Sequence, residues 1–281
     1  MTDRYAVIGN PISHSKSPLI HRMFAEQTGQ DISYEAIEAP LDGFAAAVER
    51  LRNEGYKGCN VTVPFKSQAH EVASILSDRA QIAKAVNTLT FDTERILGDN
   101  TDGVGLVRDI EQNRSIKLRG KNLLLLGAGG AAQGVSLPIL EVGANLFIYN
   151  RTAQKAQELS YGLQVFLNRQ IVTKHGLNYG LPNYINSFTE LSAKKFDLIV
   201  NATSTGLSDE MIPLPDSIFA PGALAYDMMY GRETPFMKFA RDHDAQVADG
   251  LGMLVEQAAE AFLIWRGVRP DTSPVLEVLR K

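Results

Sequence analysis

The sequence has 281 residues, of which 44% are hydrophobic and 21% are charged, and its formal net charge is -4 at pH 7. A chain of this length exceeds what one hydrophobic core usually holds, so we expect two lobes with ample length to bury a core. Scattered rather than clustered basic residues exclude the footprint of a nucleic-acid-binding protein.

No apolar run approaches the length that spans a membrane, so no membrane segment is expected. The first residues, MTDRYAVIGNP, lack the charged and apolar regions of a secretory signal. We therefore expect a cytoplasmic protein. A single cysteine, Cys59, excludes an internal disulfide and any zinc site with two thiolates, and the histidines show no HExxH-like spacing. No metal is expected.

The N-terminal segment predicts a strand at residues 4–10, a serine-rich loop and a helix that ends near Gly29. Ser17 is placed to cap this helix, with Pro18 at its first position. One cap needs only one hydroxyl, but the loop also offers Ser13 and Ser15. Such a set of donors suits a small anion, for example a carboxylate, beside a helix N-terminus. The residues alone support capping and anion binding equally.

Polar side chains follow the strand expected within NVTVPFK, residues 60–66. The alternation places Asn60 and Thr62 on one face, at the carboxyl end where ligands bind in open α/β sheets. Pro64 is expected to open the next helix, which places Lys66 in its first turn, where the helix dipole disfavours a cation. Most lysines are surface residues, but we expect Lys66 to act in a site.

Residues 86–91 and 95–100 read as two short strands that lead into the segment GDNTDG, residues 98–103. A turn rich in Asp and Asn that caps the following helix explains one aspartate, but it does not need both. Asn87 also interrupts an apolar run. Asn87 and the second aspartate, Asp102, are therefore candidates for a site.

A strand, a glycine turn and a helix follow in residues 121–139, KNLLLLGAGGAAQGVSLPI. The near-continuous apolar strand suits a parallel sheet that is covered on both faces. The glycines allow backbone N–H groups to approach a pyrophosphate at the start of the helix. The pattern is GxGxxA, and Ala132 fits the third position because that position needs only a small residue. The expected ligand is a dinucleotide.

The next strand, residues 144–149, ends about where an NAD-binding fold places an acid on the ribose, roughly 20 residues after the first glycine. Here the residues are neutral or basic: Asn150, Arg151, Thr152 and Lys155. They suit a 2′-phosphate and leave NAD without its usual carboxylate partner, so we interpret the site as NADP-binding. A solvated helix start is the alternative explanation.

The remaining residues continue the alternation of strands and helices. After a helix at 152–166, residues 168–187 show no sustained period, and strands are expected at 197–202, 223–228 and 245–249. A helix at 234–243 and a last helix from Gly250 complete the pattern, and Gln257 lies near the apolar face of the last helix. We expect a doubly wound domain after a separate α/β unit.

The motifs GNPISHSKSP, NVTVPFK, AVNTL, GDNTDG, LGAGGAA, NRT, NATSTG, DMMYG and GLGMLVEQAA occur in this order along nearly the whole chain. Together they resemble the shikimate dehydrogenase family. The resemblance implies reversible NADPH-dependent reduction of 3-dehydroshikimate to shikimate, on the route to chorismate and the aromatic amino acids. Lys66 would donate the proton that the resulting alkoxide needs, with Asp102 positioning it.

The resemblance also implies an α/β fold of two lobes. Residues 1–103 would form the substrate-binding and catalytic domain, and residues 104–249 a doubly wound Rossmann-type NADP-binding domain. Residues 250–281 would form a C-terminal helical segment that packs back on the first lobe.

Site residues are carried over from the family by position. The catalytic pair is Lys66 and Asp102. The substrate-binding residues are Ser15, Ser17, Asn60, Thr62, Asn87, Tyr230 and Gln257. The NADP-binding residues are Gly127, Gly129, Gly130, Ala131, Asn150, Arg151, Thr152, Lys155, Thr203, Ser204, Met228, Gly250 and Met253. The partners implied are the small-molecule substrate and the cofactor, with no nucleic acid and no membrane.

Several alternatives stay open at this point. A quinate/shikimate dehydrogenase that accepts NAD would show an acid in the ribose-binding group, which this sequence lacks. A non-catalytic NADP sensor would lose Lys66, Asp102 or the serine loop, and all are present. A paralogue acting on a related cyclohexene acid, and a monomer or a homodimer, also remain. Residues 161–187 exceed the usual family length and have no assigned role.

Overall fold

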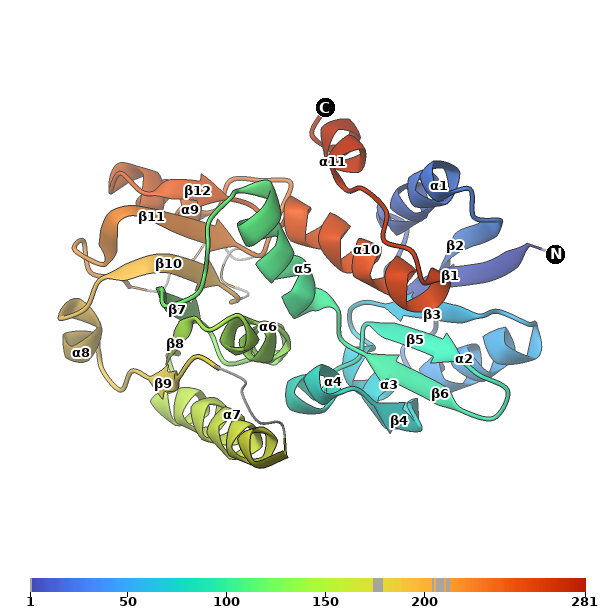
Figure 1. Cartoon of the computed structure of the whole chain (residues 1–281), viewed down its shortest axis with the longest axis horizontal. Helices are drawn as coiled ribbons and strands as arrows, with labels where there is room; N and C mark the ends of the chain where they lie inside the picture. Colours follow the sequence, from blue (N-terminus) through green and yellow to red (C-terminus); the bar gives the residue numbers. More distant parts are fainter. Residues whose placement is uncertain (1, 174–178, 204, 206–209, 211–212) are drawn as a thin grey trace. The chain divides into compact units, whose positions relative to one another are not determined.

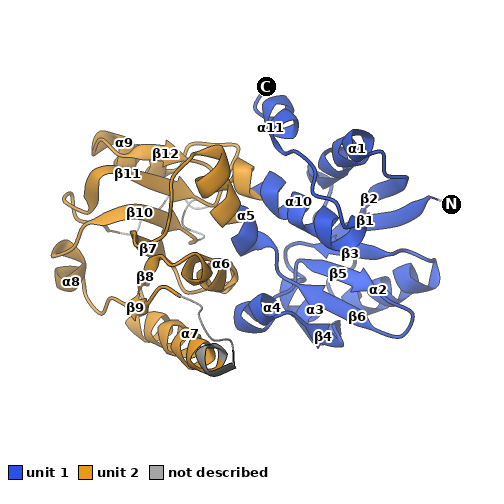
Figure 2. Cartoon of the chain, viewed as in Figure 1, with its two compact units in different colours: residues 1–105, 254–281 blue, residues 106–253 orange. Residues whose placement is uncertain are grey.

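The computed structural model describes residues 2–173, 179–203, 205, 210 and 213–281. The chain divides into two compact units: unit 1 comprises residues 1–105 and 254–281, and unit 2 comprises residues 106–253 (Figure 2). Within the described residues, no helix is both long and apolar enough to cross a membrane.

The elements alternate along the chain as Figure 1 shows. The elements up to α5 are β1 (Asp3–Gly9), α1 (Ser17–Thr28), β2 (Ile32–Glu38), α2 (Phe44–Asn53), β3 (Gly58–Val61), α3 (Lys66–Val72), β4 (Ile75–Leu76), α4 (Asp78–Ala83), β5 (Thr88–Phe91), β6 (Ile96–Asp99) and α5 (Asp102–Arg108). The elements from the π-helix η1 onward are η1 (Asp109–Asn113), β7 (Asn122–Leu126), α6 (Gly130–Glu141), β8 (Asn145–Tyr149), α7 (Ala153–Thr173), β9 (Pro182–Tyr184), α8 (Phe188–Ser192), β10 (Phe196–Asn201), β11 (Phe219–Asp227), α9 (Pro235–Asp242), β12 (Gln246–Ala248), α10 (Leu251–Arg266) and α11 (Ser273–Leu279).

Unit 1 is built on a mixed sheet with the strand order β2-β1-β3-β5-β6-β4. Strand β1 is parallel to both β2 and β3, whereas β5 is antiparallel to β3 and β6. Because β3 and β5 run in opposite directions, the carboxyl end of β3 and the residues just before β5 meet at the same edge. Asn60 and Asn87 lie next to each other at this edge.

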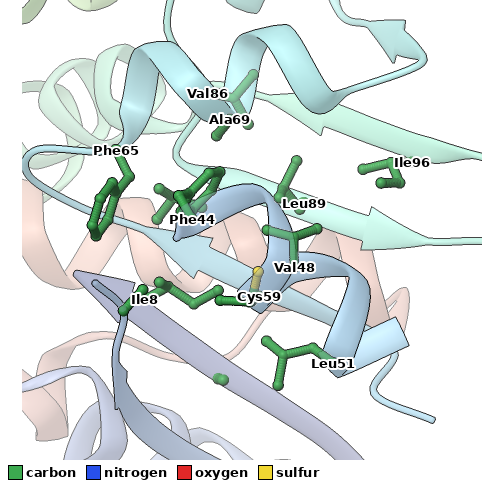
Figure 3. Close-up of a cluster of buried hydrophobic side chains, with 14 of the residues drawn as sticks. Ile8, Phe44, Val48, Leu51, Cys59, Phe65, Ala69, Val86, Leu89 and Ile96 are labelled. Atoms are coloured by element: carbon green, nitrogen blue, oxygen red, sulfur yellow. The ribbon is translucent and has the colours of Figure 1, made fainter. Parts of the chain in front are cut away.

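One face of this sheet is covered by α2 and α3, whose apolar residues form a core with β1 and β3 (Figure 3). Phe44 and Phe65 stack with ring centroids 5.0 Å apart. On α10, Phe262 is fully buried and packs edge-to-face on Phe24 of α1. Trp265 donates from Nε1 to the carbonyl of Leu89 at 3.2 Å. The end of the chain thus belongs to unit 1.

Unit 2 contains a parallel sheet with the order β12-β11-β10-β7-β8-β9. Successive side chains of a strand point to opposite faces. Leu124 and Leu126 of β7 pack into a core with α8 and α9, while Leu123 and Leu125, on the other face, are equally buried. Burial on both faces explains the four consecutive leucines. The strand order reverses between β7 and β10, which is the switch point where such sheets bind ligands.

The structure differs from the sequence expectations mainly around residues 168–187. Helix α7 runs to Thr173, beyond the expected end near residue 166, and a short strand, β9, pairs with β8. Residues 174–178 of this segment lie outside the described residues. The short elements β4, α4, α8 and α11 were not expected, because each offers fewer residues than a periodic pattern needs.

Candidate active site and cofactor site

Lys66 and Asp102 form an ion pair in unit 1, with 2.6 Å between Nζ and Oδ2. Their side chains are 31% and 14% exposed, so the pair is partly shielded but reachable. Each residue begins a helix, Lys66 that of α3 and Asp102 that of α5. The expectation that Pro64 opens the helix is wrong: Pro64 follows a cis peptide bond in a turn, and Phe65 takes the N-cap position.

The amide of Asn87 connects this pair to its surroundings. Asn87 is 3% exposed, and its Nδ2 lies 2.9 Å from Asp102 Oδ1, 2.9 Å from Thr101 Oγ1 and 3.2 Å from Gln257 Oε1. Its Oδ1 accepts a hydrogen bond from the backbone N–H of Thr101 at 2.9 Å. A buried amide with this many partners has one orientation, so the Asp102 carboxylate is held in place.

The two aspartates of GDNTDG have different partners. Asp99 accepts two hydrogen bonds from Arg79, at 2.7 and 2.8 Å, and one from Ser77 Oγ at 2.5 Å. Asn100 Oδ1 accepts the backbone N–H of Asp102 at 3.1 Å, so an asparagine satisfies the start of α5. Asp99 therefore fixes the loop, and the Asp102 side chain faces Lys66 and Asn87.

The serine loop leads into α1, which begins at Ser17 with Lys16 as its N-cap residue. Ser17 is therefore not the cap, and the side chain of the N-cap residue, Lys16, makes no capping hydrogen bond. Instead, the backbone N–H of Ser17 donates to Ser15 Oγ at 3.3 Å. Ser15 is partly exposed and Ser17 is 8% exposed.

Asn60 lies at the end of β3 with both amide protons engaged. Its Nδ2 lies 3.1 Å from the carbonyl oxygen of Asn87 and 3.1 Å from Thr88 Oγ1, and its Oδ1 accepts from the Tyr34 hydroxyl at 2.7 Å. Thr62 follows the strand and is partly exposed. Tyr34 and Thr88 could not be predicted as neighbours of Asn60, because only strand register brings them beside it.

Behind Tyr34 lies His21, a fully buried imidazole that the sequence analysis did not single out. Its ring stacks on Tyr34 with 4.1 Å between centroids, and Phe24 and Phe262 pack around it. Burial lowers the pKa of His21 to about 3, since an apolar site disfavours the charged ring. His21 is therefore neutral at physiological pH.

Unit 2 has a cavity of about 910 Å³ at the carboxyl ends of β7, β8 and β10. Its lining includes these predicted cofactor residues: Gly127, Gly129, Gly130, Ala131, Asn150, Arg151, Thr152, Lys155 and Thr203. Gly127 has a φ of +106°, which other residues rarely adopt, and an added Cβ there would meet Thr203 Cγ2 at 3.2 Å. An added Cβ at Gly129 or Gly130 would meet nothing within 4 Å, which leaves room for a phosphate against the backbone.

The ribose side of this cavity is basic. Asn150 Nδ2 donates to the carbonyl of Thr152 at 3.0 Å and closes the turn after β8. Arg151 and Lys155 are exposed, and within the described residues neither is engaged in an ion pair. Glu210 lines the same cavity. Two available cations next to a glycine turn fit a dinucleotide that carries a 2′-phosphate.

The remaining predicted residues lie elsewhere. Met228 and Tyr230 follow β11, and Gly250 and Met253 follow β12, all in unit 2, where Tyr230 is 37% exposed. Ser204 lies outside the described residues. The other predicted substrate residues all belong to unit 1, and Gln257 does so through α10.

The strand order, the glycine turn and the cavity define unit 2 as a dinucleotide-binding domain of the Rossmann type. Residues 7–89 match a family model described as the shikimate dehydrogenase substrate binding domain. Residues 250–280 match one described as the shikimate 5'-dehydrogenase C-terminal domain.

Relatives similar along the whole chain agree with these matches. The shikimate dehydrogenase (NADP(+)) of Methylobacillus flagellatus is 56% identical over 280 residues, which cover 99% of both chains. The chain therefore belongs to the shikimate dehydrogenase family.

Solved structures show the same fold. An Ael1 enzyme from Pseudomonas putida is 48% identical, with a TM-score of 0.88 over 99% of this chain and 98% of that one. The shikimate 5-dehydrogenase of Thermus thermophilus, in complex with NADP(H) and shikimate, is 33% identical, with a TM-score of 0.83 over 99% of both chains. The family resemblance and the two-lobed α/β fold predicted from the motifs are confirmed.

Proposed function

We propose that this protein catalyses the reversible, NADPH-dependent reduction of 3-dehydroshikimate to shikimate in the biosynthesis of chorismate and the aromatic amino acids. The observation that carries the proposal is the 2.6 Å pair of Lys66 and Asp102, a proton donor held by a fixed carboxylate. The name of the M. flagellatus relative and the ligands of the T. thermophilus structure support the substrate and the cofactor.

Lys66 is the proposed proton donor. NADPH, when bound, supplies a hydride to the carbonyl carbon of the substrate. The Lys66 ammonium has three N–H donors, and one of them faces Asp102. Another can donate to the carbonyl oxygen, stabilise the negative charge that develops there and deliver the proton. In the reverse direction, the amine takes this proton back from the hydroxyl of shikimate.

Asp102 positions Lys66 and the substrate relative to each other. Its Oδ2 accepts from Lys66 and its Oδ1 accepts from Asn87. Each carboxylate oxygen has a further lone pair, which can accept from a substrate hydroxyl. The Asn87 and Gln257 amides hold this arrangement, and Gln257 Nε2 donates to the carbonyl of Leu254 at 2.8 Å.

We propose that the other polar residues of unit 1 bind the rest of the substrate. The hydroxyls of Ser15, Ser17 and Thr62 can donate to the carboxylate of shikimate. Because both amide protons of Asn60 are already donated, Asn60 can offer the substrate only its oxygen, as an acceptor from a hydroxyl. Tyr230 of unit 2 is the further substrate residue proposed from the resemblance.

We propose that unit 2 holds NADP. The backbone N–H groups around Gly129 and Gly130 suit the diphosphate, and Arg151 and Lys155 suit the 2′-phosphate. The described residues fit this ligand because the glycine turn is open and the cations are exposed. Unit 1 is accordingly the substrate domain. The cytoplasmic location and the monomeric or homodimeric state stay predictions.

Deuterium transfer tests this function. Shikimate labelled with deuterium at the carbon whose hydroxyl is oxidised is incubated with the protein and NADP+, and the nucleotide is analysed by mass spectrometry. Direct hydride transfer predicts one deuterium in the nicotinamide ring of each NADPH formed. No NADPH, or NADPH without deuterium, would contradict the proposal, and heat-denatured protein is the control.

A further inference from the structure

Asp109 is a buried carboxylate with its own set of donors in unit 2. It begins the π-helix η1 and is 1% exposed. Its Oδ2 accepts a hydrogen bond from the Tyr226 hydroxyl at 2.7 Å, and its Oδ1 accepts one from Asn113 Nδ2 at 3.0 Å. Arg114 Nε lies 3.5 Å from Oδ2. A buried charge is tolerated only where such partners offset its desolvation. We therefore expect Asp109 and its partners to form a rigid part of unit 2.

The hydroxyl of Tyr226 connects this carboxylate to the first turn of α10. It donates to Asp109 and accepts the backbone N–H of Met253 at 3.3 Å. Burial, and then the negative charge of Asp109, raise the pKa of Tyr226, so the hydroxyl keeps the proton that it donates.

Gly250 and Gly252 allow the first turn of α10 to lie very close to neighbouring atoms on two sides. A Cβ at Gly252 would lie 2.0 Å from Asp109 Oδ1 and 2.2 Å from its Cγ. A Cβ at Gly250 would lie 2.2 Å from the carbonyl oxygen of Met228, and Gly250 donates to the carbonyl of Met229 at 2.9 Å. The turn is thus held by the end of β11 on one side and by the buried carboxylate on the other.

The sheet topology indicates which half of the cofactor this turn serves. In a doubly wound sheet the dinucleotide spans the switch point, with one mononucleotide half on each side. The glycine turn after β7 and the basic residues after β8 suit the adenosine side, so the nicotinamide half belongs beyond β10, where β11 and β12 end. The first turn of α10 directly follows β12.

We propose that Asp109 and Tyr226 are positioning residues that hold the first turn of α10 in place for the nicotinamide half of NADP. The inference rests on the proposed function of unit 2 and adds to it two residues that need not touch the ligand.

The test compares two ligands by calorimetry: NADP+, and 2′-phospho-ADP-ribose, which lacks only the nicotinamide. Tyr226→Phe keeps the ring and removes the hydroxyl that bridges Asp109 and Met253. We expect NADP+ to bind about tenfold more weakly, the effect of losing one buried hydrogen bond, and the fragment to bind within about twofold of wild type. Gly252→Ala, which crowds the carboxylate, is expected to show the same selectivity.

Leu191→Ala is the matched control, because Leu191 is a fully buried core residue of unit 2 that is not part of this cluster. It should lower the melting temperature and leave the affinity for both ligands unchanged. Equal weakening of both ligands in Tyr226→Phe would make the pair a general support of unit 2 and overturn the inference, as would unchanged binding of both. A wild-type chain that binds neither ligand would overturn the proposed function itself.

Discussion

At the scale of single residues, the hydrogen-bonded environment of Lys66 explains its proposed role better than its position in the sequence does. Its carboxylate partner Asp102 is fixed by Asn87, and Asn87 is fixed by the backbone of Thr101. This chain of hydrogen bonds holds the ammonium group of Lys66 in one position. We therefore assign Lys66 a role in the chemical step rather than in binding alone.

Replacing Lys66 with alanine tests that assignment. We expect Lys66→Ala to lower kcat at least about a hundredfold, since it removes the proton donor, with little change in NADP affinity. Lys57→Ala, which changes an exposed lysine of the same unit, should leave kcat unchanged. Steady-state kinetics and NADP+ titration measure both. A mild loss of kcat with a large rise in the KM for shikimate would make Lys66 a binding residue instead.

His21 gives the stability of the protein a dependence on pH. Its folded pKa of about 3 lies below the ordinary value of 6.5, so between these values only the unfolded chain binds the proton. Stability is therefore lost as pH falls below about 6.5, by about 2 kcal/mol at pH 5 relative to pH 8.

Urea unfolding at these two pH values checks the prediction. His21→Phe keeps a ring against Tyr34 but cannot titrate, so it should lose about 2 kcal/mol less stability than the wild type on acidification. Parallel losses in the two proteins would show that His21 does not cause the effect.

The residue scale also shows what the sequence could reveal of the site. Lys66 and Asp102 stand out because each sits beside a helix start in a polar segment. Tyr34 and Thr88 could not be found, because the parallel pairing of β1 with its two neighbours, and the antiparallel pairing of β3 with β5, bring them to Asn60. The expected cap at Ser17 is wrong because Lys16 takes the N-cap position.

At the scale of elements, α10 contributes buried side chains to the core of unit 1. Phe262 is fully buried against Phe24 and His21, whereas Ile264 on the same helix is 37% exposed. A helix that contributes core residues from the end of the chain should be essential for the stability of its unit.

Truncating Phe262 measures this contribution. Phe262→Ala should lower the free energy of unfolding by about 3–5 kcal/mol, through lost burial and a residual cavity. Ile264→Ala on the same helix should cost about 1 kcal/mol or less. Chemical denaturation followed by circular dichroism gives both values. Equal losses in the two variants would argue against a core position for Phe262.

Elements with a long periodic or apolar pattern were predictable, and short ones were not. Strand β7 follows from four leucines, and α6 follows from the glycine turn before it. Strand β9 has only three residues and contains Pro182, which a sequence pattern assigns to a loop; it is tolerated because β9 is an edge strand. Helix α7 continues past residue 166, where the sequence offers no stop signal before Gly176.

At the scale of the whole molecule, the two units divide the proposed reaction between substrate and cofactor. The choice of cofactor is a property of the turn after β8, since Arg151 and Lys155 are the cations that line the cavity there. NAD lacks the 2′-phosphate that these cations would bind.

The variant Arg151→Ala/Lys155→Ala should therefore raise the KM for NADP by about 10- to 100-fold, from the loss of two charge-assisted hydrogen bonds, and leave the KM for NAD nearly unchanged. Lys194→Ala, a lysine of unit 2 outside this cavity, is the control. Similar losses with both cofactors would mean that the two residues support the turn and do not recognise the phosphate.

The most direct measurement is the initial rate of oxidation of shikimate and of quinate, each with NADP and with NAD, followed by the absorbance of the reduced nicotinamide. We expect strong turnover only with shikimate and NADP. Equal turnover with quinate or with NAD would contradict the substrate or cofactor assignment and favour a quinate/shikimate dehydrogenase. No turnover with any of the four pairs would contradict the proposed activity and leave an NADP-binding protein without catalysis.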